Sequence, residues 1–353
     1  MRRLTALLLS ACLSASCGHV NPYYQPDKPH HRPDGFTNTY GPPGGRPLSD
    51  LLTWFVQRTR DGLPKPPSQF VQGYNFPVLE PDLAFLRANR TRNTATWIGH
   101  ATMLVQMNGL NILTDPIFSD RAFMVQWAGP QRKTPLPATL AELPHIDLVL
   151  VSHNHYDHLD ADTIDALNRQ PGGAPLFVVP LGVEVWMRDR GVQRVQAFDW
   201  WDSKPVAGVE VSCVPVNHWS ARNPFDRNAT LWGGWVIRAP GFSLFFAGDT
   251  GYSADFKDIG NRFGGFDLAL IPVGAYEPRW FMKDQHVDPD EAVSIHRDIK
   301  SRQSIGIHWG TFELTDEPLD QPIGDLAQAL VRAGEPVDRF VLFKHGETRI
   351  YSR

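Results

Sequence analysis

The chain has 353 residues and a mass of 39.7 kDa, enough for one large α/β domain or two smaller ones. Hydrophobic residues make up 42% of it, so a sizeable core can form and wholesale disorder is excluded. The net charge of −4 argues against a basic nucleic-acid binder, and no apolar run reaches the roughly 20 residues of a membrane span. The 13 histidines beside only 3 cysteines favour metal chemistry over a disulfide framework.

The N-terminus has the pattern of an export signal. Two arginines follow Met1, residues 4–9 are mostly apolar, and small residues come next. Residues 1–17 therefore predict a signal peptide of lipoprotein type, with Cys12 or Cys17 as the lipidated residue. The alternative is a plain cleaved signal peptide. Either way we expect an exported protein, periplasmic or anchored to a membrane as a lipoprotein.

Residues 18–75 are rich in proline and glycine and show little periodicity. We expect an extended N-terminal arm with one short helix near 48–60. His30 and His31 lie in this arm. A surface or packing role is favoured for them over metal binding.

Residues 76–353 alternate strand and helix patterns without a second boundary, which predicts a single catalytic domain. Asn108-Gly109 is a strong hairpin signal between the second and third strands of the series. Strands are expected at 95–98, 103–107, 111–114, 148–151, 176–179, 209–216, 232–238, 243–246, 268–272, 304–307 and 340–343. Helices are expected at 160–169, 183–190 and 323–332, with another opened by Asp288-Pro289. The pattern predicts an α/β sandwich rich in sheet.

Four of the expected strands are followed by a residue type that binds zinc. The strand at 148–151 leads to His153. The strands at 209–216, 243–246 and 304–307 lead to His218, Asp249 and His308 in the same way. Strand ends are where α/β folds place their chemistry. We therefore expect these side chains to converge on one site.

Residues 153–158 read His-Asn-His-Tyr-Asp-His, an H-x-H-x-D-H cluster. In an extended loop His153 and His155 can share one side and bind one metal, while Asp157 and His158 bind a second. Neutral imidazole and carboxylate are both zinc ligands. The alternative is a hydrogen-bonded histidine patch, which is disfavoured because burying three histidines and an aspartate unpaired is costly.

This cluster is similar to the hallmark motif of the metallo-β-lactamase fold superfamily. Further segments resemble the family of N-acyl-phosphatidylethanolamine-hydrolysing phospholipase D, and with Thr114–Phe118 and Lys344–Glu347 the likeness covers nearly all of residues 70–353. Those segments are VSHNHYDHLD at 151–160, 232–234, FAGDTGY at 246–252, GAYEPRWFM at 274–282, QHVDP at 285–289 and IHWGTF at 307–312. The resemblance implies an αββα four-layer sandwich. The lipoprotein-like leader departs from the animal enzymes.

The same resemblance implies a cofactor of two zinc ions. One would be held by His153, His155 and His218, the other by Asp157, His158 and His308, with Asp249 bridging the two. It also implies a phosphodiesterase in which a hydroxide shared by the metals attacks phosphorus. The products would be an N-acylethanolamine and phosphatidic acid, released from a phospholipid substrate at a membrane surface.

Two neighbouring residues are candidates for contact with the substrate. His286 is expected to contact the phosphate or protonate the departing oxygen, which would make it catalytic beside Asp157 and Asp249. Gln285 precedes it and is expected to bind substrate. Packing is an equally weighted alternative for His286. Arg279 is a candidate for the headgroup, although a solvated charge is the commoner outcome.

Two further groups carry weaker expectations. His100 and Asp115 follow early strands and are expected to orient ligand imidazoles, with turn stabilisation as the equal alternative. Phe123 and Trp127 belong to an aromatic loop that is expected to hold acyl chains, unless it folds into the core as a lid.

Two other functions compete with this interpretation. One is the same fold with another substrate, as in a lactonase, a β-lactamase or a nuclease. The other is a non-catalytic, zinc-stabilised lipoprotein that binds lipid. The sequence leaves the metal identity and the oligomeric state open, with a homodimer as one option.

Overall fold

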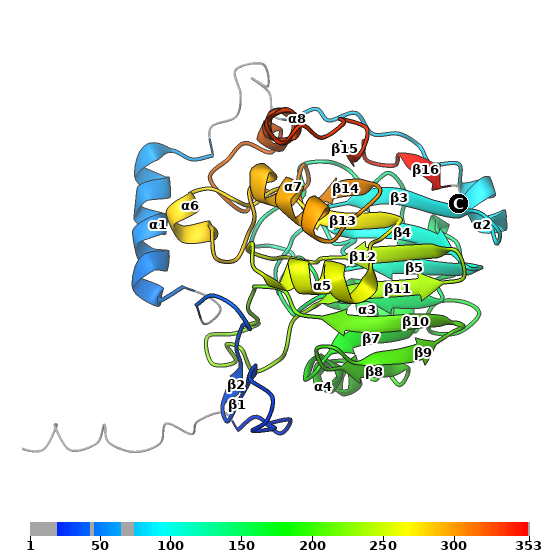
Figure 1. The fold of residues 1–353 in the computed structure, drawn as a ribbon, viewed down its shortest axis with the longest axis horizontal. Helices are drawn as coiled ribbons and strands as arrows, with labels where there is room; N and C mark the ends of the chain where they lie inside the picture. The colour runs from blue at the N-terminus through cyan, green and yellow to red at the C-terminus, as the bar shows by residue number, and fades with distance from the viewer. Residues whose placement is uncertain (1–19, 43–45, 65–73, 352–353) are drawn as a thin grey trace, which may run out of the picture.

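The computed structural model describes residues 20–42, 46–64 and 74–351 (Figure 1). The expected signal peptide and its two cysteines lie outside these residues. Two seven-stranded sheets form the centre. One has the order β16 (Thr348–Tyr351), β3 (Asn93–Gly99), β4 (Thr102–Met107), β5 (Leu110–Thr114), β6 (Leu148–Leu150), β7 (Leu176–Pro180), β8 (Val195–Phe198). The other has the order β15 (Phe340–Leu342), β14 (Ser304–Ile307), β13 (Leu268–Pro272), β12 (Phe242–Phe246), β11 (Gly234–Ala239), β10 (Val209–Val214), β9 (Ser203–Val206).

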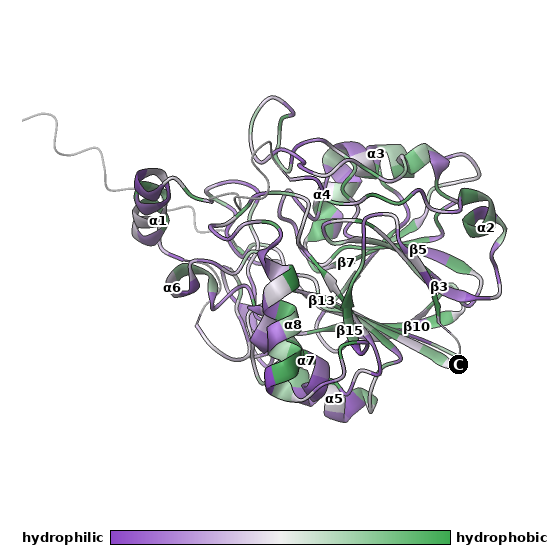
Figure 2. Ribbon diagram, turned by 90° about the horizontal axis from the view of Figure 1, so that it is seen from above, coloured by the Kyte–Doolittle hydropathy of each residue, from purple (hydrophilic) through white to green (hydrophobic). Residues whose placement is uncertain are grey.

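Helices cover the outer face of each sheet, as Figure 2 shows from above. On one side lie α3 (Ala161–Asn168) and α4 (Val183–Asp189). On the other side lie α5 (Asp255–Phe263), α7 (Pro289–Asp298) and α8 (Gln321–Ala333). The fold is therefore the expected α/β sandwich with four layers, helix, sheet, sheet and helix.

Strand β6 shows why some strands are apolar at every position. Leu148 and Leu150 pack in the core between the two sheets, whereas Val149 and Val151 pack beneath the outer helices. Successive side chains of a strand point to opposite faces, and both faces of this sheet are covered. A continuous apolar run is the result.

The structure also contains elements that the sequence analysis did not predict. Helix α5 has Gly260 in its interior, a residue that disfavours helix by about 1 kcal/mol relative to alanine. A Cβ atom on Gly260 would lie 2.0 Å from the carbonyl oxygen of Asp298 in α7. The glycine is present because α5 and α7 pack closely there. Strands β8 and β9 are short edge elements with mixed burial, which weakens their pattern.

The described part of the N-terminal arm packs on the body. Strands β1 (His31–Arg32) and β2 (Gly35–Phe36) form a small ladder. His30, His31 and Lys28 all bond to the Asp199 carboxylate, at 2.7, 2.9 and 2.5 Å. Both histidines are buried. The arm continues to α1 (Leu48–Asp61), the short helix expected near 48–60.

Three strands that lead to zinc-binding residue types run in the same direction. β10 and β12 are each antiparallel to β11, and β12, β13 and β14 are parallel. The carboxyl ends of β10, β12 and β14 therefore share one edge of their sheet. The loop after β6 reaches the same place from the opposite sheet, because a backbone bond joins Gly233 to the carbonyl of Ser152.

Asp255, at the start of α5, gives a test of stability against pH. Burial raises the pKa of this carboxyl to about 6, above its ordinary value of 3.8. The contribution of this carboxyl to the free energy of unfolding is therefore fully present below about pH 4, where the group is protonated, and is lost as pH rises through about 6. We expect Asp255→Asn to gain about 1–3 kcal/mol over the parent at pH 7.5 and little at pH 4. Urea unfolding of both proteins at the two pH values measures this, and an equal difference at both would contradict it.

Candidate metal centre

The structure brings together seven side chains that the sequence assigned to metal. Loop 153–158 follows β6 and supplies His153, His155, Asp157 and His158. The loops after β10, β12 and β14 supply the rest, which are His218, Asp249 and His308. Five of the seven side chains are almost fully buried, whereas His155 and Asp157 are partly exposed, and Asp157 retains 15% of its side-chain surface. Side chains far apart in the sequence thus meet at one edge of the sandwich.

Three histidines form a first group. The Nε2 atom of His153 lies 2.8 Å from Nδ1 of His155, and that atom lies 3.3 Å from Nε2 of His218. All three donor atoms lie within 4.8 Å of one another. A tetrahedral zinc with ligands at about 2.0–2.1 Å places its donor atoms roughly 3.3 Å apart, so this group has the size of one zinc site.

Asp157, His158 and His308 form a second group. Oδ2 of Asp157 lies 3.3 Å from Nε2 of both histidines. Oδ2 of Asp249 lies 3.1 Å from His158 and 3.2 Å from His308, and 3.9 Å from His218 of the first group. Asp249 therefore stands between the two groups, in the position of a shared ligand.

The first group has the protonation state that a metal requires. Burial lowers the pKa of His153 and of His155 well below the ordinary value and lowers the pKa of His218 to about 4. These rings are neutral at pH 7 and offer lone pairs.

In the second group the two carboxylates determine the protonation state of the neighbouring histidines. Burial alone would raise the pKa of Asp157 and of Asp249, yet both pKa values lie well below the ordinary one, chiefly because His158 is close. Burial alone would also lower the pKa of His308, but Asp249 and Asp157 raise it to about 9. The two carboxylates thus hold positive charge at this place.

Hydrogen bonds fix the orientation of the imidazoles. Nδ1 of His158 lies 2.6 Å from Oδ2 of Asp115, which also accepts from the Ser152 hydroxyl. Nδ1 of His218 donates to the carbonyl of Gln285 at 2.9 Å. Oδ1 of Asp249 is buried and has no hydrogen-bond partner among the described residues. Donor types, spacing and unpartnered ligand atoms at this place together fit bound metal.

Of the two residues expected to orient ligand imidazoles, Asp115 bonds to the His158 ring, whereas His100 bonds to the carboxylate of Asp157. Nε2 of His100 lies 2.9 Å from Oδ2 of Asp157, and Asp115 contacts His158 as described. His100, Asp115 and His308 all have positive φ, at 54°, 32° and 63°. Such backbone conformations are uncommon outside glycine and concentrate at functional sites. Burial lowers the pKa of His100 to about 3, so its ring is a neutral hydrogen-bond donor.

Asp115→Asn tests the support of His158. Both carboxylate oxygens of Asp115 accept hydrogen bonds, one from the Ser152 amide and the other from Ser152 Oγ and His158. An amide must turn one NH2 group toward these donors. We expect zinc affinity to fall about 10- to 100-fold, measured by competition with a chromogenic chelator. Asp290→Asn, at an exposed pair with Arg332, is the control. Parental affinity in Asp115→Asn would contradict the role.

A cavity of about 240 Å³ opens onto the metal centre. Asp157, Asp249, Gln285 and His286 reach its wall. Nδ1 of His286 is buried, lies 3.8 Å from Oδ2 of Asp249 and has no hydrogen-bond partner within the described part of the chain. The apolar wall comes from α1, from α6 (Arg279–Met282) and from nearby loops, through Leu51, Trp54, Phe281, Met282 and Leu314.

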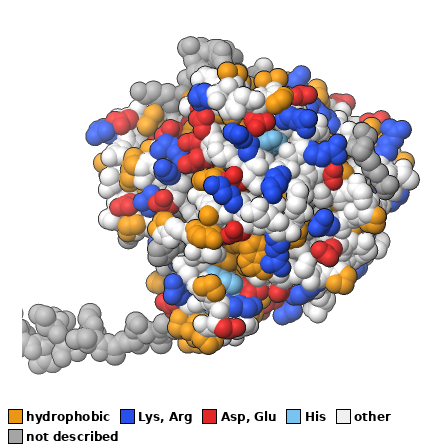
Figure 3. Space-filling view, in the orientation of Figure 1, with side chains coloured by type: hydrophobic (Ala, Val, Ile, Leu, Met, Phe, Trp, Pro, Cys, Tyr) orange, Lys and Arg blue, Asp and Glu red, His pale blue; other side chains and the backbone are white. Residues whose placement is uncertain are grey.

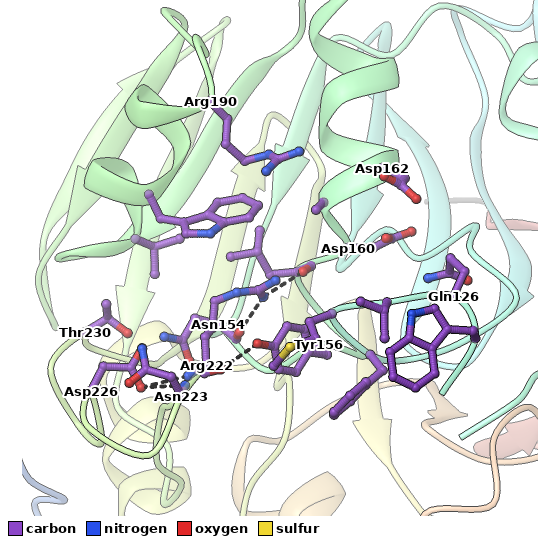
Figure 4. Close-up of a pocket in the computed structure, with 18 residues that line it drawn as sticks. Gln126, Asn154, Tyr156, Asp160, Asp162, Arg190, Arg222, Asn223, Asp226 and Thr230 are labelled. Carbon is purple, nitrogen blue, oxygen red and sulfur yellow. Dashed lines mark hydrogen bonds between the residues drawn. The ribbon is translucent and has the colours of Figure 1, made fainter. Parts of the chain in front are cut away.

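Three of the expected substrate residues lie elsewhere. The guanidinium of Arg279 donates to the carbonyls of Tyr276 and His286 and to Glu291, so it holds the backbone of His286. Phe123 and Trp127 line a separate cavity of about 710 Å³ (Figure 4). The two cavities have residues of loop 153–158 in their walls, but different ones.

Sequence reasoning missed several residues that shape the site. Oδ1 of Asn38, in the N-terminal arm, accepts from the backbone amide of His218 and from the Trp232 indole, both at 3.1 Å. Trp54 of α1 covers the small cavity. Neither residue lies near a motif, so no local signal marks them. Ser152 was detectable, because it immediately precedes the cluster.

Comparison with known proteins defines the class. The family model "Beta-lactamase superfamily domain" matches residues 110–309, and the chain belongs to that superfamily. The metallo-β-lactamase fold protein YhfI from Bacillus subtilis superposes with a TM-score of 0.53 at 14% identity, covering 74% of this chain and 100% of that one. The isothiocyanate hydrolase from Delia radicum gut bacteria superposes with a TM-score of 0.59 at 18% identity, covering 73% of this chain and 99% of that one.

Curated relatives narrow the class. The N-acyl-phosphatidylethanolamine-hydrolyzing phospholipase D 1 of Caenorhabditis elegans is 44% identical over 62% of this chain and 64% of its own length. The mitochondrial protein of that name from Saccharomyces cerevisiae is 38% identical over 72% of this chain and 55% of its own length. A metal-dependent hydrolase of Methanopyrus kandleri is 30% identical over 72% of this chain and 97% of its own length. The chain is a metal-dependent hydrolase of the superfamily, similar to these phospholipases and spanning less than two thirds of their length.

Proposed function

We propose that the chain is a di-zinc phosphodiesterase that hydrolyses N-acyl-phosphatidylethanolamine to an N-acylethanolamine and phosphatidic acid. The observation that carries this proposal is the small cavity, where three of the seven metal-binding side chains, His155, Asp157 and Asp249, adjoin an apolar wall from α1 and α6. The wall suits a substrate with hydrocarbon next to its phosphate. Similarity to the nematode and yeast phospholipases supports the same substrate.

Zinc at these positions would activate a water molecule for attack on phosphorus and offset charge on the phosphate oxygens. The five histidines and two aspartates would hold it. The remaining polar groups of the cavity act on the substrate. Burial lowers the pKa of His286 to about 3, so its ring is neutral at pH 7 and serves as a hydrogen-bond donor to a phosphate oxygen rather than as an acid. Gln285 supplies an amide from the same turn.

The larger cavity suits an acyl chain. Trp127 is 82% exposed and Phe123 is 38% exposed, and both stand on its rim with Met124. Exposed aromatic residues around a cavity are typical of apolar ligand sites. A nuclease function is not favoured. Figure 3 shows basic and acidic side chains interspersed over one face of the molecule rather than a continuous basic surface.

A substrate panel tests the proposal. Purified protein is incubated with N-acyl-phosphatidylethanolamine, a β-lactam, a lactone and a soluble phosphodiester, and products are identified by mass spectrometry. We expect release of an N-acylethanolamine and phosphatidic acid at the highest kcat/KM of the panel. Preference for the lactone or the lactam, or turnover of none of them, would overturn it.

The membrane is the proposed partner surface. Leu52, Phe55 and Val56 of α1 are 57%, 51% and 67% exposed, beside the wall of the small cavity. In Figures 1 and 2, α1 and α6 stand next to each other at the edge of the molecule. No described helix is long and apolar enough to cross a bilayer. The variant in which Leu52, Phe55 and Val56 are all replaced by serine is sedimented with anionic and with neutral vesicles, and we expect it to bind less than the parent. Unchanged binding would contradict the membrane contact. If this face instead joins two copies of the chain, analytical ultracentrifugation of the parent would detect the self-association.

Export and lipid anchoring of the chain are proposed from its first 17 residues. Expression of the full chain in a bacterium, followed by fractionation and mass spectrometry of the mature N-terminus, identifies the processed cysteine. Retention of the intact leader in the cytoplasm would contradict the proposal.

A further inference from the structure

Arg222 bonds to both ends of the loop that carries most of the proposed metal ligands. Its Nη1 atom donates to the carbonyl of Asn154 and to the carbonyl of Leu159, each at 2.8 Å. His155, Asp157 and His158 lie between these two carbonyls. One nitrogen therefore joins the two ends of this segment, and the dashed lines in Figure 4 mark hydrogen bonds of Arg222 and its neighbours.

The side chain of Arg222 is itself fixed. Its guanidinium carbon lies 4.2 Å from the ring centre of Tyr156 and 4.7 Å from that of Trp186 in α4. The Tyr156 hydroxyl donates back to the carbonyl of Arg222, and the Arg222 amide donates to Asp226 at 2.9 Å. A planar cation between two ring faces has little freedom, so the two carbonyls are held at fixed positions.

The guanidinium of Arg222 is largely buried, which disfavours its charged form. Burial lowers the pKa of Arg222 to about 10. The nearby Arg190 also contacts Trp186, at 5.1 Å, but pairs with Asp165 and bonds to neither carbonyl. Arg222 differs from Arg190 in its bonds to the loop, which gives it a task beyond packing.

We propose that Arg222 is a positioning residue that sets the geometry of loop 153–158 for metal binding. The inference rests on the proposed metal site. Since the loop gives His155 to one metal and Asp157 and His158 to the other, loss of Arg222 affects both sites.

Zinc competition titration and the visible spectrum of the cobalt-substituted protein test the proposal on R222A, R222K and R190A. We expect R222A to bind zinc about 10- to 100-fold more weakly at both sites and to show shifted cobalt bands. R222K, which keeps a donor but loses the planar stacking, is expected between R222A and the parent. R190A is expected to match the parent in both measurements.

Parental affinity and spectrum in R222A would overturn the inference, as would an equal loss in R190A, which would show a general packing effect. If R222A does not fold, R222K against R190A decides, and parental behaviour of R222K then counts against the inference. A parent protein that binds no zinc would instead refute the proposed metal site, so the two failures are distinguishable.

Discussion

Asp249→Asn is expected to remove metal and turnover together. Asp249 is the carboxylate that stands between the two groups of histidines, with Oδ2 3.1 Å from His158 and 3.2 Å from His308. Asparagine has nearly the same shape, so the change removes charge and little packing. We expect metal content to fall below one equivalent and turnover to fall at least about 1,000-fold, or roughly 4 kcal/mol in the barrier. Elemental analysis and product formation on the same sample measure both quantities.

The matched control for this change is Asp255→Asn. Asp255 is also a buried aspartate that follows β12, but it bonds to Ser253 rather than to the metal centre. It is expected to keep parental metal content. Full turnover with both metals in Asp249→Asn would contradict the assignment of Asp249.

His286→Ala is expected to separate catalysis from metal binding. The ring reaches the cavity wall with a neutral imidazole, and the carbonyl of His286 is held by Arg279. Loss of one donor to a charge that develops during reaction costs about 100- to 1,000-fold in kcat. We expect this loss with two metals still bound, and partial rescue in His286→Gln.

The pH profile distinguishes the two roles considered for His286. A neutral donor leaves the profile between pH 6 and 8 unchanged when it is removed. An acid would instead give a basic limb that disappears in the variant. A loss of metal in His286→Ala would show that the residue is a ligand, against the present assignment.

The sequence predicted the fold well where periodicity is strong. Strands such as β6 and β13 are apolar throughout because both faces are buried, and the capping residue Asp288 marked the start of α7. Helix α5 was missed because Gly260, required by the close approach to Asp298, weakens its pattern. Local pattern cannot report a packing contact between elements distant in sequence.

The same limit applies to the site. Residues 153–158 form a compact motif, so convergence of its histidines could be predicted, and His218, Asp249 and His308 followed from strand ends and resemblance. Asn38, Trp54 and Arg222 contact this centre only through tertiary packing. The positive φ of His308 occurs together with a hydrogen bond from its amide to the carbonyl of His100, and no sequence pattern specifies this contact.

Zinc titration of metal-free protein, with hydrolysis of N-acyl-phosphatidylethanolamine as the readout, tests the central claim most directly. The account predicts no turnover without metal and a rise to a plateau at two zinc ions per chain. Turnover in the metal-free protein, or a plateau at a single equivalent, would contradict it.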